Sequence, residues 1–115
     1  MSYSDVLAEK VRVALARVPR VREKKMFGST AFMVNGKMCV SVGHNRLMCR
    51  IDPGLHEAAT QRKGTRTVKM GKREYKGYVY VNEEGLQSKS QLEYWLRLSL
   101  DFNGKAKSSR ARKRK

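Results

Sequence analysis

Residues 26–42 have the sequence MFGSTAFMVNGKMCVSV, and this stretch decides the fold expected for the chain. Two runs rich in apolar and β-branched residues, 29–34 and 37–42, flank the dipeptide Asn35-Gly36. An Asn-Gly pair between two such runs favours a two-residue type I′ turn, because both central residues of that turn need positive φ. The stretch therefore predicts a β-hairpin.

An amphipathic pattern predicts a helix before this hairpin. Apolar residues recur there at helical spacing, which places them on one side of a helix. They are Leu7, Val11, Leu15 and Val18. The predicted helix runs from about Ser4 to Val18, and Pro19 ends it.

The segments after the hairpin predict three more strands and two more helices. The strands are expected at 46–51, 65–70 and 75–81, a short helix at 52–62 and a last helix at 89–102. Ser88 and Gln91 have the spacing of a capping box for the last helix. The order α-β-β-β-α-β-β-α predicts an α+β fold, in which helices pack on one face of an antiparallel five-stranded sheet.

Hairpin geometry predicts which side chains share a face of the sheet. A two-residue turn at Asn35-Gly36 sets Ala31 opposite Val40, and a turn at His44-Asn45 sets Val40 opposite Cys49. The face expected to lie away from the helices, and to contact a partner, carries Phe32, Val34, Cys39, Met48, Arg50, Tyr78 and Tyr80, with Lys37 beside them. Cys39 and Cys49 then lie on opposite faces, which disfavours a disulfide between them.

Two hypotheses for this half-apolar, half-basic face stay open at this point. In the first, a helix or a second copy of the chain covers it, so the protein is a homodimer or binds another protein. In the second, the face is an open platform on which the bases of single-stranded nucleic acid stack, with Arg and Lys beside the aromatic rings.

The charge of the chain indicates a polyanionic partner. The 26 Lys and Arg residues outnumber the 10 Asp and Glu residues, for a net charge of +16. Such a field attracts nucleic acids, anionic lipids and acidic proteins. Residues 1–103 are predicted to form the folded domain and carry +9, and residues 104–115 are predicted to form a disordered basic tail. The candidate DNA or RNA contacts in this tail are Lys105, Lys107, Arg110, Arg112, Lys113, Arg114 and Lys115.

The sequence contains no pattern typical of a catalytic or metal site. Cys39, Cys49, His44 and His56 lack the spacing of a zinc site, and both histidines are expected at the surface. No carboxylates are spaced as an acid–base pair, and no glycine-rich phosphate loop is present. We therefore expect no enzyme activity, cofactor, metal or small-molecule substrate. Because no apolar run reaches membrane length and no signal segment is evident, we expect a cytoplasmic protein without a membrane partner.

Several of these motifs together resemble the TfoX N-terminal domain of the Sxy/TfoX competence regulators. The matching residues are Met26-Phe27-Gly28, Asn35-Gly36-Lys37-Met38, Lys76 to Val81 and Trp95, and the resemblance covers roughly Val11 to Phe102. It implies a regulatory or interaction module and no catalytic residues. Competence regulators of this family act as coactivators beside a cyclic-AMP-responsive DNA-binding protein and carry a second, helical domain. This chain is similar to their first domain, followed by the basic tail.

Overall fold

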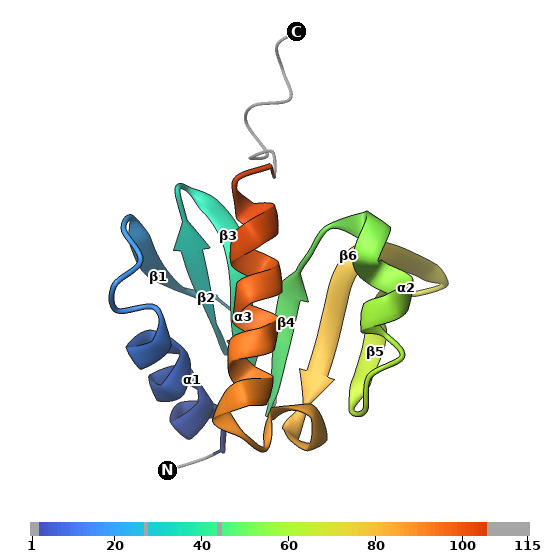
Figure 1. The fold of residues 1–115 in the computed structure, drawn as a ribbon, viewed down its shortest axis with the longest axis horizontal. Coiled ribbons are helices and arrows are strands. Elements are labelled where there is room, and N and C mark those ends of the chain that lie inside the picture. Colours follow the sequence, from blue (N-terminus) through green and yellow to red (C-terminus); the bar gives the residue numbers. More distant parts are fainter. Residues whose placement is uncertain (1–2, 27, 44, 106–115) are drawn as a thin grey trace, which may run out of the picture.

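Six antiparallel strands form one sheet and three helices pack against it in the part of the chain that the computed structural model describes, residues 3–26, 28–43 and 45–105 (Figure 1). The helices are α1 (Tyr3–Ala14), α2 (His56–Ala59) and α3 (Lys89–Asn103). The strands are β1 (Val21–Met26), β2 (Ser29–Val34), β3 (Lys37–Gly43), β4 (Arg46–Arg50), β5 (Thr65–Met70) and β6 (Arg73–Asn82). They lie in the order β1-β2-β3-β4-β6-β5. The predicted α+β class is confirmed.

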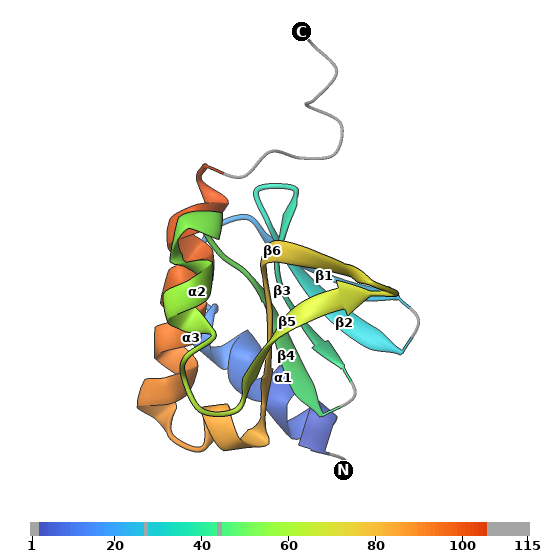
Figure 2. The ribbon, with the colours of Figure 1, turned by 90° about the vertical axis from the view of Figure 1, so that its right-hand side faces the viewer.

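The three helices lie on the same side of the sheet, as Figure 2 shows. Helix α3 contacts β3 and β4 in the middle of the sheet, α1 lies beside it over β3, and α2 packs against β6. The β1–β2 and β5–β6 hairpins extend away from the helical layer (Figure 2). The opposite side of the sheet therefore has no described helix over it.

Strand β1 was missing from the sequence prediction, which gave five strands instead of six. Its sequence, VREKKM, has a run of four charged residues and therefore no alternation of apolar and polar side chains. It forms because it pairs along its whole length with β2 at the edge of the sheet. Glu23 also accepts a hydrogen bond of 2.8 Å from Nη2 of Arg12, which ties β1 to α1 and lowers the pKa of Glu23.

A β-bulge between β2 and β3 changes which residues face the helices. The pair Met33–Met38 has the predicted register, but Phe32 lies opposite Val40, so the predicted pair Ala31–Val40 is wrong. Cys39 is the extra residue of the bulge, and a bulge re-aims side chains near it. As a result, Cys39 and Val40 both belong to the hydrophobic core. The next hairpin has the predicted register, with Val40 opposite Cys49.

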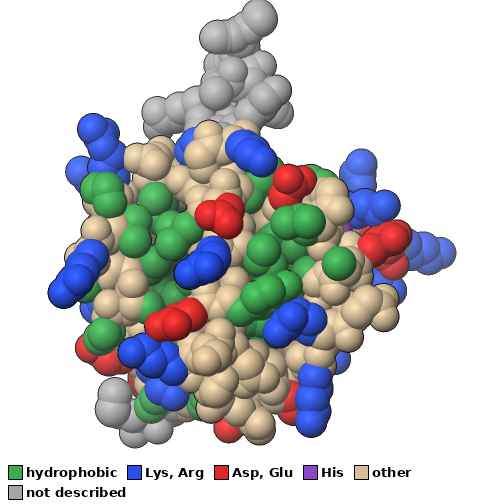
Figure 3. Space-filling model, in the orientation of Figure 1, with side chains coloured by type: hydrophobic (Ala, Val, Ile, Leu, Met, Phe, Trp, Pro, Cys, Tyr) green, Lys and Arg blue, Asp and Glu red, His purple; other side chains and the backbone are tan. Residues whose placement is uncertain are grey.

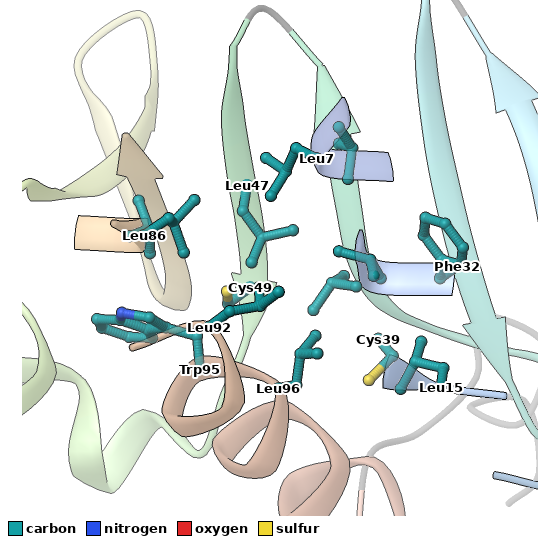
Figure 4. Packing of buried hydrophobic residues seen from close by; sticks show 14 of the residues in the cluster. Leu7, Leu15, Phe32, Cys39, Leu47, Cys49, Leu86, Leu92, Trp95 and Leu96 are labelled. Atoms are coloured by element: carbon teal, nitrogen blue, oxygen red, sulfur yellow. The ribbon is translucent and has the colours of Figure 1, made fainter. Parts of the chain in front are cut away.

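The core fills the space between the sheet and the helices (Figure 4). Trp95 of α3 and Phe32 of β2 are its largest fully buried side chains. The predicted stripe on α1 supplies Leu7 and Val11, although the helix ends at Ala14 and not at Val18. The apolar faces of the helices and the inner face of the sheet thus pack into one core, which holds the sheet against the helices.

Both ends of α3 are fixed by hydrogen bonds. At its start, Ser88 and Gln91 form the predicted capping box. At its end, the buried side chain of Asn103 donates a hydrogen bond of 3.1 Å from Nδ2 to the carbonyl oxygen of Val34. This bond holds the last residue of the helix against the β2–β3 hairpin.

The two cysteines are free thiols, and both lie on the helical side of the sheet, so their predicted placement on opposite faces is wrong. Burial raises the pKa of Cys39 to about 12. Burial also raises the pKa of Cys49, and the neighbouring Ser99 hydroxyl lowers it only in part.

These shifts predict that stability falls at alkaline pH. The folded chain keeps both thiol protons above the unfolded pKa of about 8.5, whereas the unfolded chain loses them. Between about pH 7.5 and about pH 9.5, the two thiols together are expected to lower the free energy of unfolding by about 2.5–3 kcal/mol. Urea unfolding of the wild type and of the Cys39→Ala/Cys49→Ala variant at both pH values measures this difference. An equal loss in the two proteins would contradict the assignment.

Candidate interaction face

The side of the sheet without helices, here called the uncovered face, is defined by the alternation of side chains along the strands. Phe32, Cys49 and Val79 belong to the core, so the neighbours of each along its strand point away from the helices. Strand pairing assigns to the uncovered face the charged and aromatic side chains Arg22, Lys24, Arg46, Arg50, Arg66, Tyr78 and Tyr80. Lys69 and Glu74 are assigned to it because they line the same pocket as Arg46, Arg66 and Tyr80. Its apolar side chains are Ala31, Met33, Met38 and Met48.

One row of cross-strand pairs runs the whole width of this face. It consists of Lys24, Ala31, Ser41, Met48, Tyr80 and Arg66. Because neighbouring strands are about 4.8 Å apart, the row is about 24 Å long when measured along the sheet. The row therefore has a cation at each end and small or apolar side chains between them.

The tyrosines of the uncovered face lie against arginines. The guanidinium carbon of Arg46 lies 3.6 Å from the ring centroid of Tyr80. That of Arg50 lies 5.7 Å from the ring of Tyr78 and 5.8 Å from the ring of Phe102 on α3. A guanidinium within about 6 Å of an aromatic ring is attracted by the ring quadrupole. These contacts restrict where the two arginines can place their charge.

A polar pocket of about 590 Å³ opens on this face where β4, β5 and β6 adjoin. Its lining residues are Arg46, Arg66, Thr67, Lys69, Glu74 and Tyr80. Glu74 is the acidic member, and its carboxylate lies 3.7 Å from Nζ of Lys69. Arg46 and Arg66 thus leave the pocket with an excess of positive charge.

The structure places only some of the predicted partner residues on the uncovered face. Met48, Arg50, Tyr78 and Tyr80 lie there, half-buried. Phe32, Val34 and Cys39 do not: they are buried beneath the helices, so their predicted placement on the uncovered face is wrong. The cause is the bulge at Cys39, which shifts the register by one residue along β2.

Several cations of the uncovered face were missed from the sequence. Arg22 and Lys24 belong to the unpredicted strand β1, so no face could be assigned to them. Arg46 and Arg66 lie on predicted strands, where Arg46 precedes the buried Leu47 and Arg66 precedes the half-buried Thr67. Their alternation with Leu47 and Thr67 is the signal that could have identified them.

The predicted tail contacts lie almost entirely outside the described residues. Lys107, Arg110, Arg112, Lys113, Arg114 and Lys115 belong to that segment, and their role stays a prediction. Lys105 is described and exposed, and its Nζ lies 3.9 Å from a carboxylate oxygen of Asp52. This ion pair is exposed, so it contributes little to stability.

His56 is a buried structural residue, so its predicted surface position is wrong. Its Nδ1 accepts a hydrogen bond of 2.9 Å from the backbone N–H of Gly77. Its Nε2 lies 2.9 Å from Oγ1 of Thr67. Because Nδ1 is an acceptor, the ring is the neutral tautomer with its proton on Nε2. His44 lies outside the described residues.

The helical side of the molecule carries a second feature, a groove of about 1040 Å³ between α1 and α3. Leu7, Leu15, Leu92 and Leu96 contribute apolar surface to it. Figure 3 shows apolar side chains on this side of the molecule lying between charged ones. Val13 also lines the groove and is 66% exposed.

Two further observations concern the described part of the chain only. Within residues 3–26, 28–43 and 45–105, no three His, Cys, Asp or Glu side chains gather closely enough to hold a metal ion. In the same ranges, none of the helices has the length and apolar character needed to cross a membrane.

Comparison with families of known proteins gives a match over most of the chain. The family model of the TfoX N-terminal domain matches residues 13–103. No curated protein matches the chain. The matched range extends from within α1 to the last residue of α3 and includes the whole sheet. Since this is most of the chain, the protein belongs to the TfoX N-terminal domain family.

Proposed function

We propose that this chain is a non-enzymatic interaction module that holds nucleic acid against the uncovered face of its sheet. The observation that carries the proposal is the row from Lys24 to Arg66, which sets a cation at each end of about 24 Å of sheet, measured along its surface. Among the described residues of this face, the acidic side chain is Glu74, and Lys69 already pairs with it. The basic segment after residue 104 adds phosphate contacts without sequence preference.

The chemistry of the buried reactive groups supports a non-enzymatic role. Both ring nitrogens of His56 make hydrogen bonds within the fold. Cys39 and Cys49 are buried and their pKa values are raised, so the thiols stay protonated and are poor nucleophiles. These three side chains are buried parts of the fold, and none of them is exposed where a substrate could reach it.

A homodimer with a protein-binding role is the second candidate. A two-fold interface uses the same patch on both copies, so pairing through the uncovered face would bring two arrays of arginine and lysine together. The groove between α1 and α3 suits a second copy better. Its α1 side carries Glu9, Lys10 and Arg17, and its α3 side carries two acidic and two basic residues, so each side offers both signs of charge for pairing between two copies. The exposed Val13 would fill the groove of the partner copy.

Fluorescence anisotropy with a short labelled DNA duplex tests the proposed function. We expect the wild type to bind, with an affinity that falls steeply between about 50 and 200 mM salt. The variant Lys24→Glu/Arg66→Glu is expected to bind at least about tenfold more weakly, and the slope of log K against log salt to fall by about 2.

The matched control reverses two exposed cations on the helical side, in the variant Lys89→Glu/Arg97→Glu. It has the same net charge as the first variant. An equal loss of affinity in both would show that binding depends on net charge and not on the cations of the uncovered face, which would contradict the proposed site. A chain ending at residue 105 measures the contribution of the basic segment. Absence of binding by the wild type at low salt would overturn the proposal, and sedimentation velocity would then test the homodimer.

A further inference from the structure

We propose that the uncovered face binds the phosphate backbone of a duplex through the pocket lined by Arg46 and Arg66, and that it does not stack on unpaired bases. This inference rests on the proposed function, because it specifies which form of nucleic acid is bound and by which groups.

The contact between Arg46 and Tyr80 is the first step of the argument. At 3.6 Å from the ring centroid, the guanidinium carbon is in van der Waals contact with the ring, so the guanidinium covers the ring face on this side of the sheet. Single-stranded nucleic acid is typically held by bases stacked on exposed aromatic rings. That face of the Tyr80 ring cannot accept a base while the guanidinium of Arg46 covers it.

The ring of Tyr78 is also in contact with other side chains of the chain. Its ring makes an edge-to-face contact with Tyr75, with centroids 6.3 Å apart, and the guanidinium of Arg50 lies 5.7 Å from it. Both tyrosines assigned to the uncovered face are therefore in contact with other side chains of the same chain. The aromatic residues that suggested a stacking platform from sequence act instead as supports for arginines.

The supported arginine suits a phosphate group. A guanidinium presents N–H donors in a planar fork that matches two oxygens of a phosphate, and fixing its plane reduces the entropy lost on binding. In the pocket, Arg66 lies opposite Tyr80 on the neighbouring strand, so its charge adds to that of Arg46. At about 590 Å³, the pocket has ample room for one phosphodiester group.

The position of the pocket favours a duplex over a single strand. The pocket lies at the β5 end of the cross-strand row, and Lys24 stands at the other end, about 24 Å away when measured along the sheet. The sheet fixes this separation before the ligand arrives. A duplex presents its phosphates at fixed separations too, whereas a flexible single strand has to be ordered at an entropic cost. Contacts to phosphates carry no sequence information, so this mode of binding is expected to have no sequence preference.

The experiment compares duplex and single-stranded DNA of two unrelated sequences, using anisotropy on the full chain. We expect the duplex to bind at least about tenfold more tightly than either single strand, with equal affinities for the two duplex sequences. Arg46→Ala is expected to weaken duplex binding about tenfold. Arg46→Lys keeps the charge but loses the fork and is expected to recover only part of that affinity.

Stacking predicts the opposite pattern, because Arg46→Ala frees the ring of Tyr80. Tighter single-strand binding by Arg46→Ala, or a preference of the wild type for single strands, would overturn this inference and leave the proposed function standing. Arg97→Ala, on the helical side, is the control and is expected to bind duplex like the wild type. Absence of binding to every probe at low salt would overturn the proposed function, and this inference with it. Circular dichroism confirms that each variant is folded.

Discussion

Replacing Trp95 with alanine is expected to lower the free energy of unfolding by about 3–5 kcal/mol. The indole is 1% exposed and lies beside Leu86 and Leu92 in the core, so its removal leaves a large cavity there (Figure 4). A domain of this size has a total stability of about 5–15 kcal/mol, so the change removes a large share of it. Urea unfolding followed by far-UV circular dichroism measures the loss of stability. Tryptophan fluorescence cannot follow the unfolding of the variant, because Trp95 is the sole tryptophan of the chain.

Arg97→Ala is the matched control for this prediction. Arg97 is exposed on the same helix, so its replacement is expected to change the stability by no more than about 0.5 kcal/mol. Trp95→Phe retains an aromatic ring and is expected to fall between the two. A loss below about 1.5 kcal/mol in Trp95→Ala would show that the core collapses into the space, contrary to the packing described.

Replacing His56 with alanine is expected to cost about 2–4 kcal/mol, the second largest effect. The side chain is 4% exposed and links α2 to two strands through Gly77 and Thr67. Its removal leaves the backbone N–H of Gly77 buried without an acceptor, which carries the desolvation penalty of an unpaired donor. It also removes the contact that holds α2 against β6. Thermal and urea unfolding at neutral pH measure the change.

Glu57→Ala, next to it on α2, is exposed and serves as the control, with an expected change of no more than about 0.5 kcal/mol. Thr67→Val tests the hydrogen bond between Thr67 and His56 by itself, since it removes the hydroxyl and keeps the shape of the side chain. The double variant His56→Ala/Thr67→Val is expected to lose less than the sum of the single variants, because the two residues share that bond. Strict additivity would contradict the hydrogen bond between them.

Local sequence signals predicted most of the fold, and they failed where the fold depends on distant contacts. The Asn35-Gly36 turn, the Ser88 capping box and the register of β3 against β4 depend on neighbouring residues, and all three are confirmed. Strand β1 has no such signal, because it is held by pairing with β2. No pattern in the sequence marks a bulge at Cys39, and this one residue reversed the predicted face of β2.

The candidate face could be predicted only in part for the same reason. The sequence placed Met48, Arg50, Tyr78 and Tyr80 on the correct side of the sheet, since β4 and β6 pair in regular register there. The stacking of Arg46 on Tyr80 is a contact between two strands that are 34 residues apart in the chain, and no spacing rule predicts it. The proposal that this face binds phosphate groups and does not stack on bases depends on that contact.

The two edges of the sheet have a consequence for solubility. In the sheet, β1 and β5 each have a strand neighbour on one side only, and bare backbone edges readily join with those of other copies to form fibres. The edge strands carry Arg22, Lys24, Lys25, Arg66 and Lys69. Like charges on approaching edges repel, so these residues keep the sheet from growing beyond its own chain. A polyanion that neutralises them therefore also removes this protection against polymerisation.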